Sequence, residues 1–274
     1  MHHPVDLAEQ LAVLDVVSEG RLDVGIGRGG TLQDYQTFQS DRDDSRARVE
    51  EGIALIQQCW SGEPFDFTGR FHSAERLHVR PRPVQRPYPP LFIAANSEDS
   101  VRSAARLGLP TLSSFFVPIP ELQRRREVYR EEALSAGHSA AKIERLEQLA
   151  WGMRVVHIAE SREEALSVTE APFMGYQHKM AVLRSEGTGG TIPNSFDRTY
   201  VRLRPFLDYM KDGLALFGTP DEVRDGLRSY VEATGHQRIM LLMALPGLET
   251  GPALRSMRLF IEKVAPELTA VAQK

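Results

Sequence analysis

The chain has 274 residues, of which 42% are hydrophobic and 26% charged, and its formal net charge is -4. A chain of this length and composition can bury the core of one large globular domain or of two ordinary ones. The slight acidity offers no basic surface for nucleic acid and no polybasic segment for an anionic membrane, so neither partner is expected. No apolar run reaches the roughly 18 residues of a membrane-spanning helix, and the N-terminus lacks the regions of a signal peptide. These features predict a cytoplasmic protein.

Cys59 is the single cysteine of the sequence, which excludes an internal disulfide and a cysteine-based metal site. It stands beside Trp60 on the apolar face of a predicted helix, so we expect a buried and unreactive thiol. The histidines show no metal-ligand spacing, and no metal is predicted. We expect His72 and His236 on solvated surfaces, whereas His157 falls within a predicted strand.

The first third of the chain is predicted to alternate helices with short strands. Leu7, Leu11 and Leu14 recur at helical spacing, and Gly20 follows as a stop signal. A later segment has strand–turn–strand character and then five prolines between residues 81 and 90, which indicates a hairpin and an extended connection. The predicted elements are a helix over 4–18, a strand over 21–26, a helix over about 44–61 and a hairpin excursion over 64–90.

The rest of the chain continues this alternation. Thr219 is a predicted N-cap, Pro220 opens the helix after it, and Gly235 ends that helix. Strands are expected over 91–97, 109–116, 151–161 and 238–245, with helices over 99–108, 120–137, from 162, over 218–235 and over 252–265. A strand followed by a helix, five times over, predicts an α/β fold with a parallel sheet. The five parallel strands are placed at 22–26, 91–95, 111–116, 152–158 and 238–244.

Residues 25–30, GIGRGG, fit the G-x-G-x-x-G pattern of a dinucleotide-binding turn. Such a turn leads at once into a helix, but the next apolar helical stripe begins only near Val49, and Gly25 lies inside the strand pattern. We therefore favour a second interpretation, a strand end that opens onto a ligand. There the small residues let the ligand approach the backbone, and Arg28 supplies a cationic fork suited to phosphate.

Four blocks of the chain, in order, resemble the luciferase-like flavin monooxygenases. The first is HHPVDLAEQLAVLDVVSEGRLDVGIGRGG, which is similar to a helix leading into a strand that ends G-x-G-R-G in that family. The others are PLFIAANSEDSVRSAARLGLPTLSS, FGTPDEVRDGLRSYVEATG and RIMLLMALPGLETGPALRSMRLFIEKVAP. Together they span most of residues 2–266.

The resemblance implies a TIM barrel, of (β/α)₈ type, that binds FMN at its C-terminal mouth. It assigns FMN phosphate contacts to Arg28, and to Asn96 and Ser97 in the turn after a later strand. Luciferase itself has Glu in place of Asn96. The cofactor-binding residues predicted in this way are Gly27, Arg28, Gly29, Asn96, Ser97 and Ser114, with Ser113 as a further lining residue. The resemblance assigns no catalytic residue to this chain.

The resemblance further implies a monooxygenase that uses reduced FMN and O₂ to oxygenate an organic substrate. A separate NAD(P)H-dependent flavin reductase would supply the reduced flavin. Two alternatives stay open: a non-catalytic FMN-binding protein or inactive truncated paralogue, and a deazaflavin-dependent oxidoreductase of the same fold. Arg28 favours FMN, because deazaflavin relatives more often end this strand in small residues.

The family barrel has eight strands, whereas five are predicted here. We therefore expect one luciferase-like domain over residues 1–274 that lacks the first three strands of the barrel. Insertions are expected at about 64–90 and 185–199, the second at the position of the family's mobile lid. An open sheet would expose edges and the apolar helix face over residues 7–17, so a homodimer or other oligomer is expected, and no turnover without the missing strands.

Overall fold

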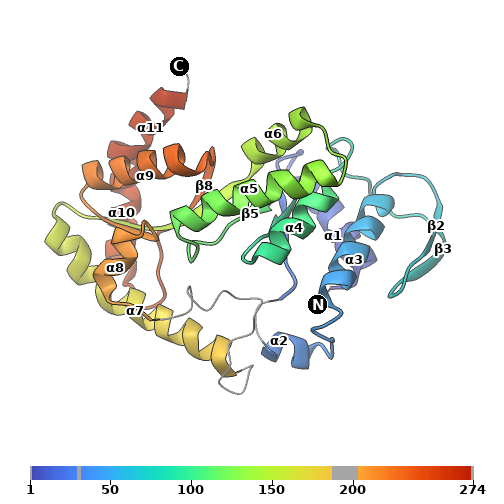
Figure 1. The fold of residues 1–274 in the computed structure, drawn as a ribbon, viewed down its shortest axis with the longest axis horizontal. Coiled ribbons are helices and arrows are strands. Elements are labelled where there is room, and N and C mark those ends of the chain that lie inside the picture. The colour runs from blue at the N-terminus through green and yellow to red at the C-terminus, as the bar shows by residue number, and fades with distance from the viewer. Residues whose placement is uncertain (1, 30–31, 187–202, 273–274) are drawn as a thin grey trace. The chain divides into compact units, whose positions relative to one another are not determined.

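The computed structural model describes residues 2–29, 32–186 and 203–272 (Figure 1). The chain divides into two compact units, unit 1 over Met1–Ile93 and unit 2 over Ala94–Lys274. Within the described residues, no helix is both long enough and apolar enough to cross a membrane. Most of the predicted insertion over 185–199 lies outside the described residues, since only its first two residues belong to a described helix.

Unit 1 is built on two packed helices. Ala8 and Ala12 of the first helix are fully buried, and such small side chains let a second helix approach closely. Trp60, also fully buried, donates from its indole Nε1 to the Ala8 carbonyl oxygen at 3.0 Å. The elements of this unit are α1 (Pro4–Val17), β1 (Val24–Ile26), α2 (Leu32–Thr37), α3 (Ser45–Cys59), β2 (Phe65–Thr68), β3 (Ser73–Leu77) and β4 (Leu91–Ala94, whose last residue opens unit 2).

A buried carboxylate fixes the proline-rich connection to α1. Asp15 is fully buried, and its Oδ2 accepts hydrogen bonds from the backbone N–H groups of Val84 and Gln85 at 2.7 and 3.0 Å. Its Oδ1 accepts a third bond from Gln85 Nε2 at 2.7 Å. A carboxylate with three donors is well compensated for its burial, so Asp15 orders a segment that has no regular structure of its own.

The strands of unit 1 follow the predicted pattern. Strand β1 pairs with β4 in parallel, with Val24 opposite Leu91. Strands β2 and β3 form the antiparallel hairpin predicted within 64–90, with Phe65 opposite Leu77 and an irregularity in register after Phe65. The helices predicted over 4–18 and about 44–61 are confirmed as α1 and α3.

Cys59 ends α3 and is buried, as predicted. Burial, with a smaller contribution from the charge of Glu9, raises the pKa of the thiol to about 11. Because the thiolate is the reactive form, we expect no reaction with an aromatic disulfide reagent at about pH 8 in the folded protein. In guanidinium chloride the protein unfolds and full labelling is expected. The reaction is measured by the absorbance of the thiolate that the reagent releases. Fast labelling without denaturant would contradict this burial.

In unit 2 the central strand is the longest one. Strand β6 pairs in parallel with β5 at Leu112–Trp151, with β8 along its first half and with β7 along its second half. The elements are α4 (Glu98–Leu107), β5 (Thr111–Leu112), α5 (Ile119–Ser135), α6 (Ala140–Leu149), β6 (Trp151–Ile158), α7 (Arg162–Glu186), α8 (Phe206–Lys211), β7 (Ala215–Gly218), α9 (Pro220–Thr234), β8 (Arg238–Leu242), α10 (Thr250–Leu259), the π-helix η2 (Phe260–Val264) and α11 (Ala265–Ala272).

Alternate residues of β6 pack on opposite sides of the strand. Val155 joins a core cluster with Phe173 of α7 and Phe217 of β7, whereas Val156 joins a second cluster with Val223 and Leu227 of α9. The Phe173 ring meets the rings of Tyr209 and Phe217 edge-on, at centroid distances of 5.0 and 5.5 Å. A strand covered on both sides reads as an almost unbroken apolar run, as VVHI does here.

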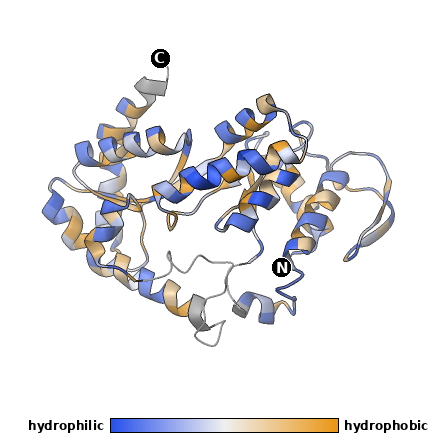
Figure 2. Ribbon diagram, viewed as in Figure 1, coloured by the Kyte–Doolittle hydropathy of each residue, from blue (hydrophilic) through white to orange (hydrophobic). Residues whose placement is uncertain are grey.

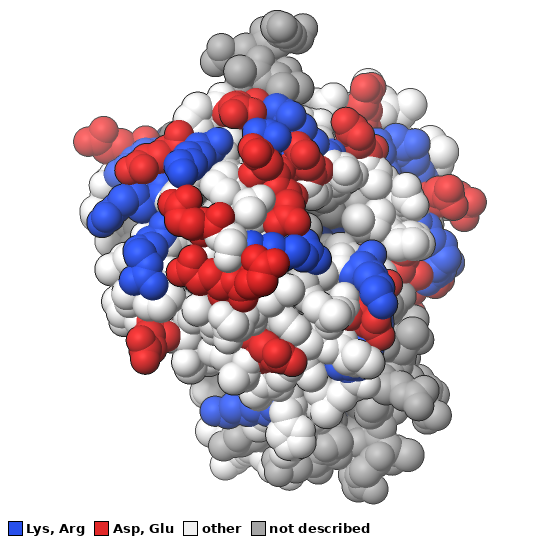
Figure 3. All heavy atoms as spheres, turned by 90° about the vertical axis from the view of Figure 1, so that its left-hand side faces the viewer, with Lys and Arg blue, Asp and Glu red and all other residues white. Residues whose placement is uncertain are grey.

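Helix α9 shows the end signals that the sequence predicts. Thr219 and Glu222 form a reciprocal capping box, Pro220 occupies the first turn, and Gly235 ends the helix in the left-handed conformation. Hydrophobic and hydrophilic residues alternate along α9 and α5 (Figure 2), as expected for helices with one buried side. Acidic and basic side chains intermingle on the face of the molecule seen in Figure 3.

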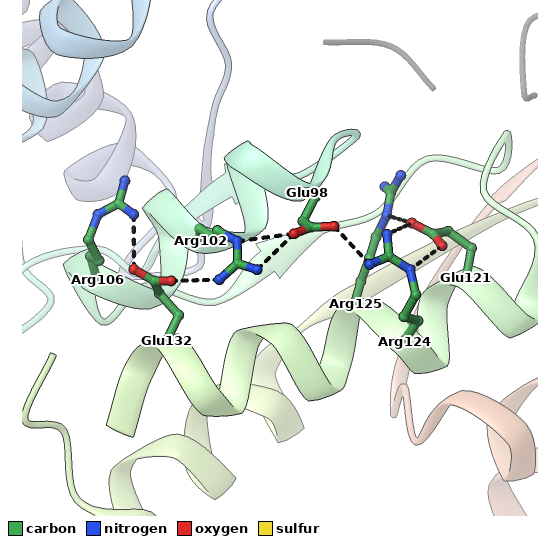
Figure 4. A network of polar contacts seen from close by, with 7 residues as sticks. All are labelled: Glu98, Arg102, Arg106, Glu121, Arg124, Arg125 and Glu132. Atoms are coloured by element: carbon green, nitrogen blue, oxygen red, sulfur yellow. Dashed lines mark hydrogen bonds and ion pairs between the residues drawn. The ribbon is translucent and has the colours of Figure 1, made fainter. Parts of the chain in front are cut away.

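An ion-pair network joins α4 to α5 (Figure 4). Arg102 of α4 donates both to Glu98 on its own helix and to Glu132 of α5, at 2.8 and 2.9 Å. Arg124 of α5 returns to Glu98 at 2.8 Å. The full network is Glu98, Arg102, Arg106, Glu121, Arg124, Arg125 and Glu132. Networks of this kind fix geometry better than isolated surface pairs, and this one holds α4 against α5 from its first turn to its last.

The predicted parallel α/β pattern is confirmed, but the count of five strands is wrong for the described residues. Strand β7 was missed because its four residues, ALFG, are too few to show a period. Helix α2 lies before Val49, where the sequence shows no apolar helical stripe. Helices α6 and α8 were not predicted either, and all three have ten residues or fewer. Strand β5 covers only Thr111–Leu112 of the predicted 111–116.

Candidate functional site

The glycine-rich turn follows β1 directly. Gly27 and Gly29 are exposed, and Gly29 has a φ of +92°, a conformation that favours glycine. Arg28 between them is half-buried. Its carbonyl oxygen accepts a hydrogen bond from the hydroxyl of Tyr35 at 2.9 Å, so α2 fixes the backbone of the turn.

Arg28 lies in the wall of a cavity of about 560 Å³ within unit 1. This volume is in the range of small-molecule sites, which bind an apolar body and a few fixed polar groups. One part of the wall is apolar and is provided by Pro4, Leu7, Ile26, Val49, Ile53 and Ile56. The polar part is provided by His2, Arg28, Asp34, Gln39, Ser40, Ser45, Arg48 and His72, with Gly27 and Gly29 beside them.

Two polar groups in this wall are buried without a partner. The Oγ of Ser45 and the Nε of Arg48 make no hydrogen bond in the described structure, and Ser45 is only 2% exposed. Buried polar atoms are normally paired, because each unpaired one costs free energy. Both residues lie in the first turn of α3 and face the same cavity. They were not among the predicted site residues.

His72 belongs to the turn of the β2–β3 hairpin, and a carboxylate on α3 holds it at the cavity wall. Glu51 accepts hydrogen bonds from the backbone N–H groups of Arg70 and His72, at 2.7 and 2.8 Å, and from Phe71 at 3.0 Å. The Nδ1 of His72 lies 2.9 Å from Glu51 Oε1. Burial raises the pKa of Glu51, but the hydrogen bonds outweigh it and leave that pKa lowered. The prediction of a solvated His72 is therefore wrong.

The predicted residues of unit 2 gather where β4 and β5 end. Asn96 Oδ1 accepts a hydrogen bond from the backbone N–H of Ser114 at 3.1 Å, and Ser114 Oγ accepts from Phe116 N–H at 3.4 Å. Ser97 is the N-cap of α4, where its Oγ accepts from Ser100 N–H at 3.3 Å and lies 3.0 Å from Ser100 Oγ. Ser113 is buried, and its N–H donates to the Trp151 carbonyl.

The structure thus places the predicted residues in two groups. Gly27, Arg28 and Gly29 share the unit 1 cavity. Asn96, Ser97 and Ser114 share a hydrogen-bonded turn of unit 2. No cluster of three or more potential metal ligands occurs among the described residues.

Two histidines of unit 2, one buried and one half-buried, lie outside both groups. His157 is 2% exposed within β6, and burial lowers its pKa; its Nδ1 has no hydrogen-bond partner in the described structure. His236 lies 2.7 Å from the hydroxyl of Tyr230, and burial, helped by the charge of Arg154, lowers its pKa to about 4. The prediction of a solvated His236 is wrong, because the residue is half-buried and its Nδ1 is paired with the Tyr230 hydroxyl.

A family model for luciferase-like monooxygenases matches residues 1–237. The chain belongs to the luciferase-like monooxygenase family. This confirms the resemblance found in the sequence. The fold around the glycine turn is therefore luciferase-like and not a dinucleotide-binding fold. The G-x-G-R-G segment of this luciferase-like protein begins in the last two residues of β1 and continues into the turn after it, so it lies at a strand end as the favoured interpretation expects.

Among curated proteins, the alkanal monooxygenase alpha chain of Photobacterium leiognathi is 28% identical over 277 residues, covering 97% of this chain and 76% of that protein. The oxygenase component of the flavin-dependent trigonelline monooxygenase of Acinetobacter baylyi is 26% identical over 274 residues, covering 97% and 72%. Among solved structures, the monooxygenase RslO1 of Streptomyces bottropensis is 28% identical, with a TM-score of 0.79, covering 97% of this chain and 74% of that one. The luciferase-like chain is therefore similar to monooxygenases, one of them flavin-dependent by name, along almost its whole length.

Proposed function

We propose that this chain is the oxygenase of a two-component, cytoplasmic flavin-dependent monooxygenase. It uses reduced FMN and O₂ to place one oxygen atom in an organic substrate, and the other oxygen atom leaves as water. A separate NAD(P)H-dependent reductase returns the flavin to its reduced form. The observation that carries the proposal is the Gly27–Gly29 turn, which brings Arg28 to the wall of a cavity of small-molecule size in a member of this family.

The donor set of unit 1 suits the phosphate end of FMN. A guanidinium presents a planar fork that matches phosphate oxygens, and glycines let a phosphate approach the backbone N–H groups. In this proposal Arg28 binds the phosphate, Gly27 and Gly29 leave room for it, and Asn96, Ser97 and Ser114 are further FMN-binding residues. Reduced FMN, when bound, supplies the two electrons that the reaction with O₂ requires.

The apolar residues of the cavity have a second task. Ile26, Ile53 and Ile56 line the same wall as Arg28. Side chains of this kind exclude water, which strengthens the interaction between a guanidinium and a bound anion and protects a reactive cofactor from solvent. The cavity is thus suited to bind an organic molecule and to keep it dry.

Cofactor choice is the simplest expected result. The glycine turn ends a strand of a luciferase-like fold, so we expect FMN to bind and NADH to show no comparable affinity. Titration calorimetry with each cofactor in turn measures both. Micromolar binding of NADH together with no binding of FMN would contradict the proposal, as would binding of a deazaflavin in place of FMN.

Turnover tests the function itself. The protein is mixed with chemically reduced FMN and air-saturated buffer containing a panel of organic substrates, and oxygen incorporation is followed by mass spectrometry with ¹⁸O₂. The proposal expects one labelled oxygen atom in a product, and such a product would contradict the expectation, drawn from the strand count, of no turnover without the missing strands. FMN binding without any labelled product from the panel would favour the alternative of a non-catalytic flavin-binding protein.

A further inference from the structure

The first turn of α3 carries two buried polar groups that the fold itself does not use. Ser45 Oγ and Arg48 Nε are both without a partner in the described structure, and both residues line the unit 1 cavity. A native protein rarely leaves two such groups three residues apart unless a ligand or water completes them. The first turn of a helix also carries a partial positive charge, which favours an anion there.

Arg48 is held in place by an aromatic ring. Its guanidinium carbon lies 4.2 Å from the centre of the Phe71 ring, and Phe71 is fixed in turn by its N–H bond to Glu51. Stacking on an aromatic ring fixes the plane of a guanidinium while leaving its N–H edge available to an acceptor. The neighbouring carboxylate of Asp44 is occupied by Arg70 Nη2 at 2.7 Å.

The same face of α3 becomes apolar further along the helix. Ser45, Val49, Ile53 and Ile56 recur at spacings of four, four and three residues, and all four line the cavity. Gly52 lies on this face too, and a Cβ there would meet the Pro4 ring at 3.4 Å. Eleven residues of helix span about 16 Å. The cavity therefore has an anion-binding end and a long apolar wall. Among the described residues that line the cavity, the acidic one is Asp34.

We propose that Ser45 and Arg48 form an anion subsite that binds the carboxylate of an organic acid, whose apolar body lies along Val49, Ile53 and Ile56. This rests on the proposed function in one respect, that the acid is the substrate to be oxygenated. Ser45 Oγ donates to one carboxylate oxygen and the Arg48 N–H edge to the other. The phosphate of FMN offers the same anionic oxygens, but the long apolar wall that continues from Ser45 fits an organic acid better.

The test measures binding without flavin, by titration calorimetry with phenylbutyrate and with its uncharged analogue phenylbutanol. We expect R48M to weaken phenylbutyrate binding about 10-fold or more, the scale of a charged hydrogen bond, and S45A to weaken it about fivefold. Phenylbutanol affinity stays unchanged in both variants. R46M is the matched control on the same helix, because Arg46 does not line the cavity, and it keeps wild-type affinity for both probes.

Thermal stability separates binding from folding. Since the Ser45 hydroxyl has no partner in the described structure, S45A should melt at the same temperature as the wild type or higher, while still losing affinity for the acid. A structural role for Ser45 predicts the opposite, a lower melting temperature, and that result would overturn the assignment.

FMN titrations of the same variants decide between the two sources of anion. Unchanged FMN affinity in S45A and R48M, with weaker acid binding, supports the proposal. Loss of FMN affinity with unchanged acid binding assigns the subsite to the flavin phosphate and overturns the proposal, as does wild-type protein that does not distinguish phenylbutyrate from phenylbutanol. Acid binding that depends on Ser45 and Arg48, in a protein without oxygenase turnover, would sink the proposed function and leave the subsite standing.

Discussion

Arg28→Ala is expected to raise the dissociation constant of FMN about 10- to 150-fold, which corresponds to about 1.5–3 kcal/mol. Arg28 lies in the turn after β1, and the Tyr35 hydroxyl fixes the backbone of that turn. Phosphate binding therefore costs little further ordering of the backbone. An alanine there removes both the charge and the fork. The measurement is the quenching of FMN fluorescence on titration with protein.

The size of the effect in a second variant shows what kind of contact is lost. Arg28→Lys keeps the charge but not the planar fork, so its FMN affinity should fall between those of the wild type and the alanine variant. Arg21→Ala serves as the control, since Arg21 is exposed in the same unit and donates to the Ser18 carbonyl at 2.8 Å. Equal FMN affinity in the wild type and Arg28→Ala would remove Arg28 from the flavin site.

The elements that sequence predicted well are those with strong local signals. Helix α9 has its N-cap, its proline and its terminal glycine within residues 219–235, and the structure contains all three in those roles. Strand β8 lies in a segment, residues 238–245, that is apolar along nearly its whole length, and β6 lies within the strand predicted over 151–161. Strand β7 and helices α2 and α8 have six residues or fewer, so tertiary packing, and not local pattern, decides their structure.

The candidate site was predicted in part for a related reason. Arg28 follows glycines at a strand end, a pattern visible in one stretch of sequence. Ser45 and Arg48 look like ordinary residues at the start of a polar helix, and only the fold shows that their polar atoms are buried and without a partner. The position of His72 depends on a contact with Glu51, 21 residues away, which no spacing rule contains.

Glu51→Gln is expected to lower the free energy of unfolding by about 2–3 kcal/mol, because hydrogen bonds to a carboxylate are among the strongest in a protein. The carboxylate accepts from three consecutive backbone N–H groups and contacts the His72 ring, so it fixes the hairpin turn to α3. A glutamine retains one acceptor oxygen and loses the charge. Urea unfolding followed by tryptophan fluorescence measures the change.

The pH dependence of this contribution has a definite sign. Hydrogen bonds leave the pKa of Glu51 in the folded protein below its ordinary value of 4.5, despite the opposing effect of burial. The stabilisation is therefore fully present above about pH 4.5 and is lost as the pH falls through the lowered folded pKa. The difference between wild type and Glu51→Gln should accordingly be largest near neutral pH and shrink in acid. Glu63→Gln, at an exposed position of the same unit, should show no such change. A Glu51→Gln variant as stable as the wild type at neutral pH would mean that the carboxylate does not hold the hairpin, and that His72 reaches the cavity wall by packing alone.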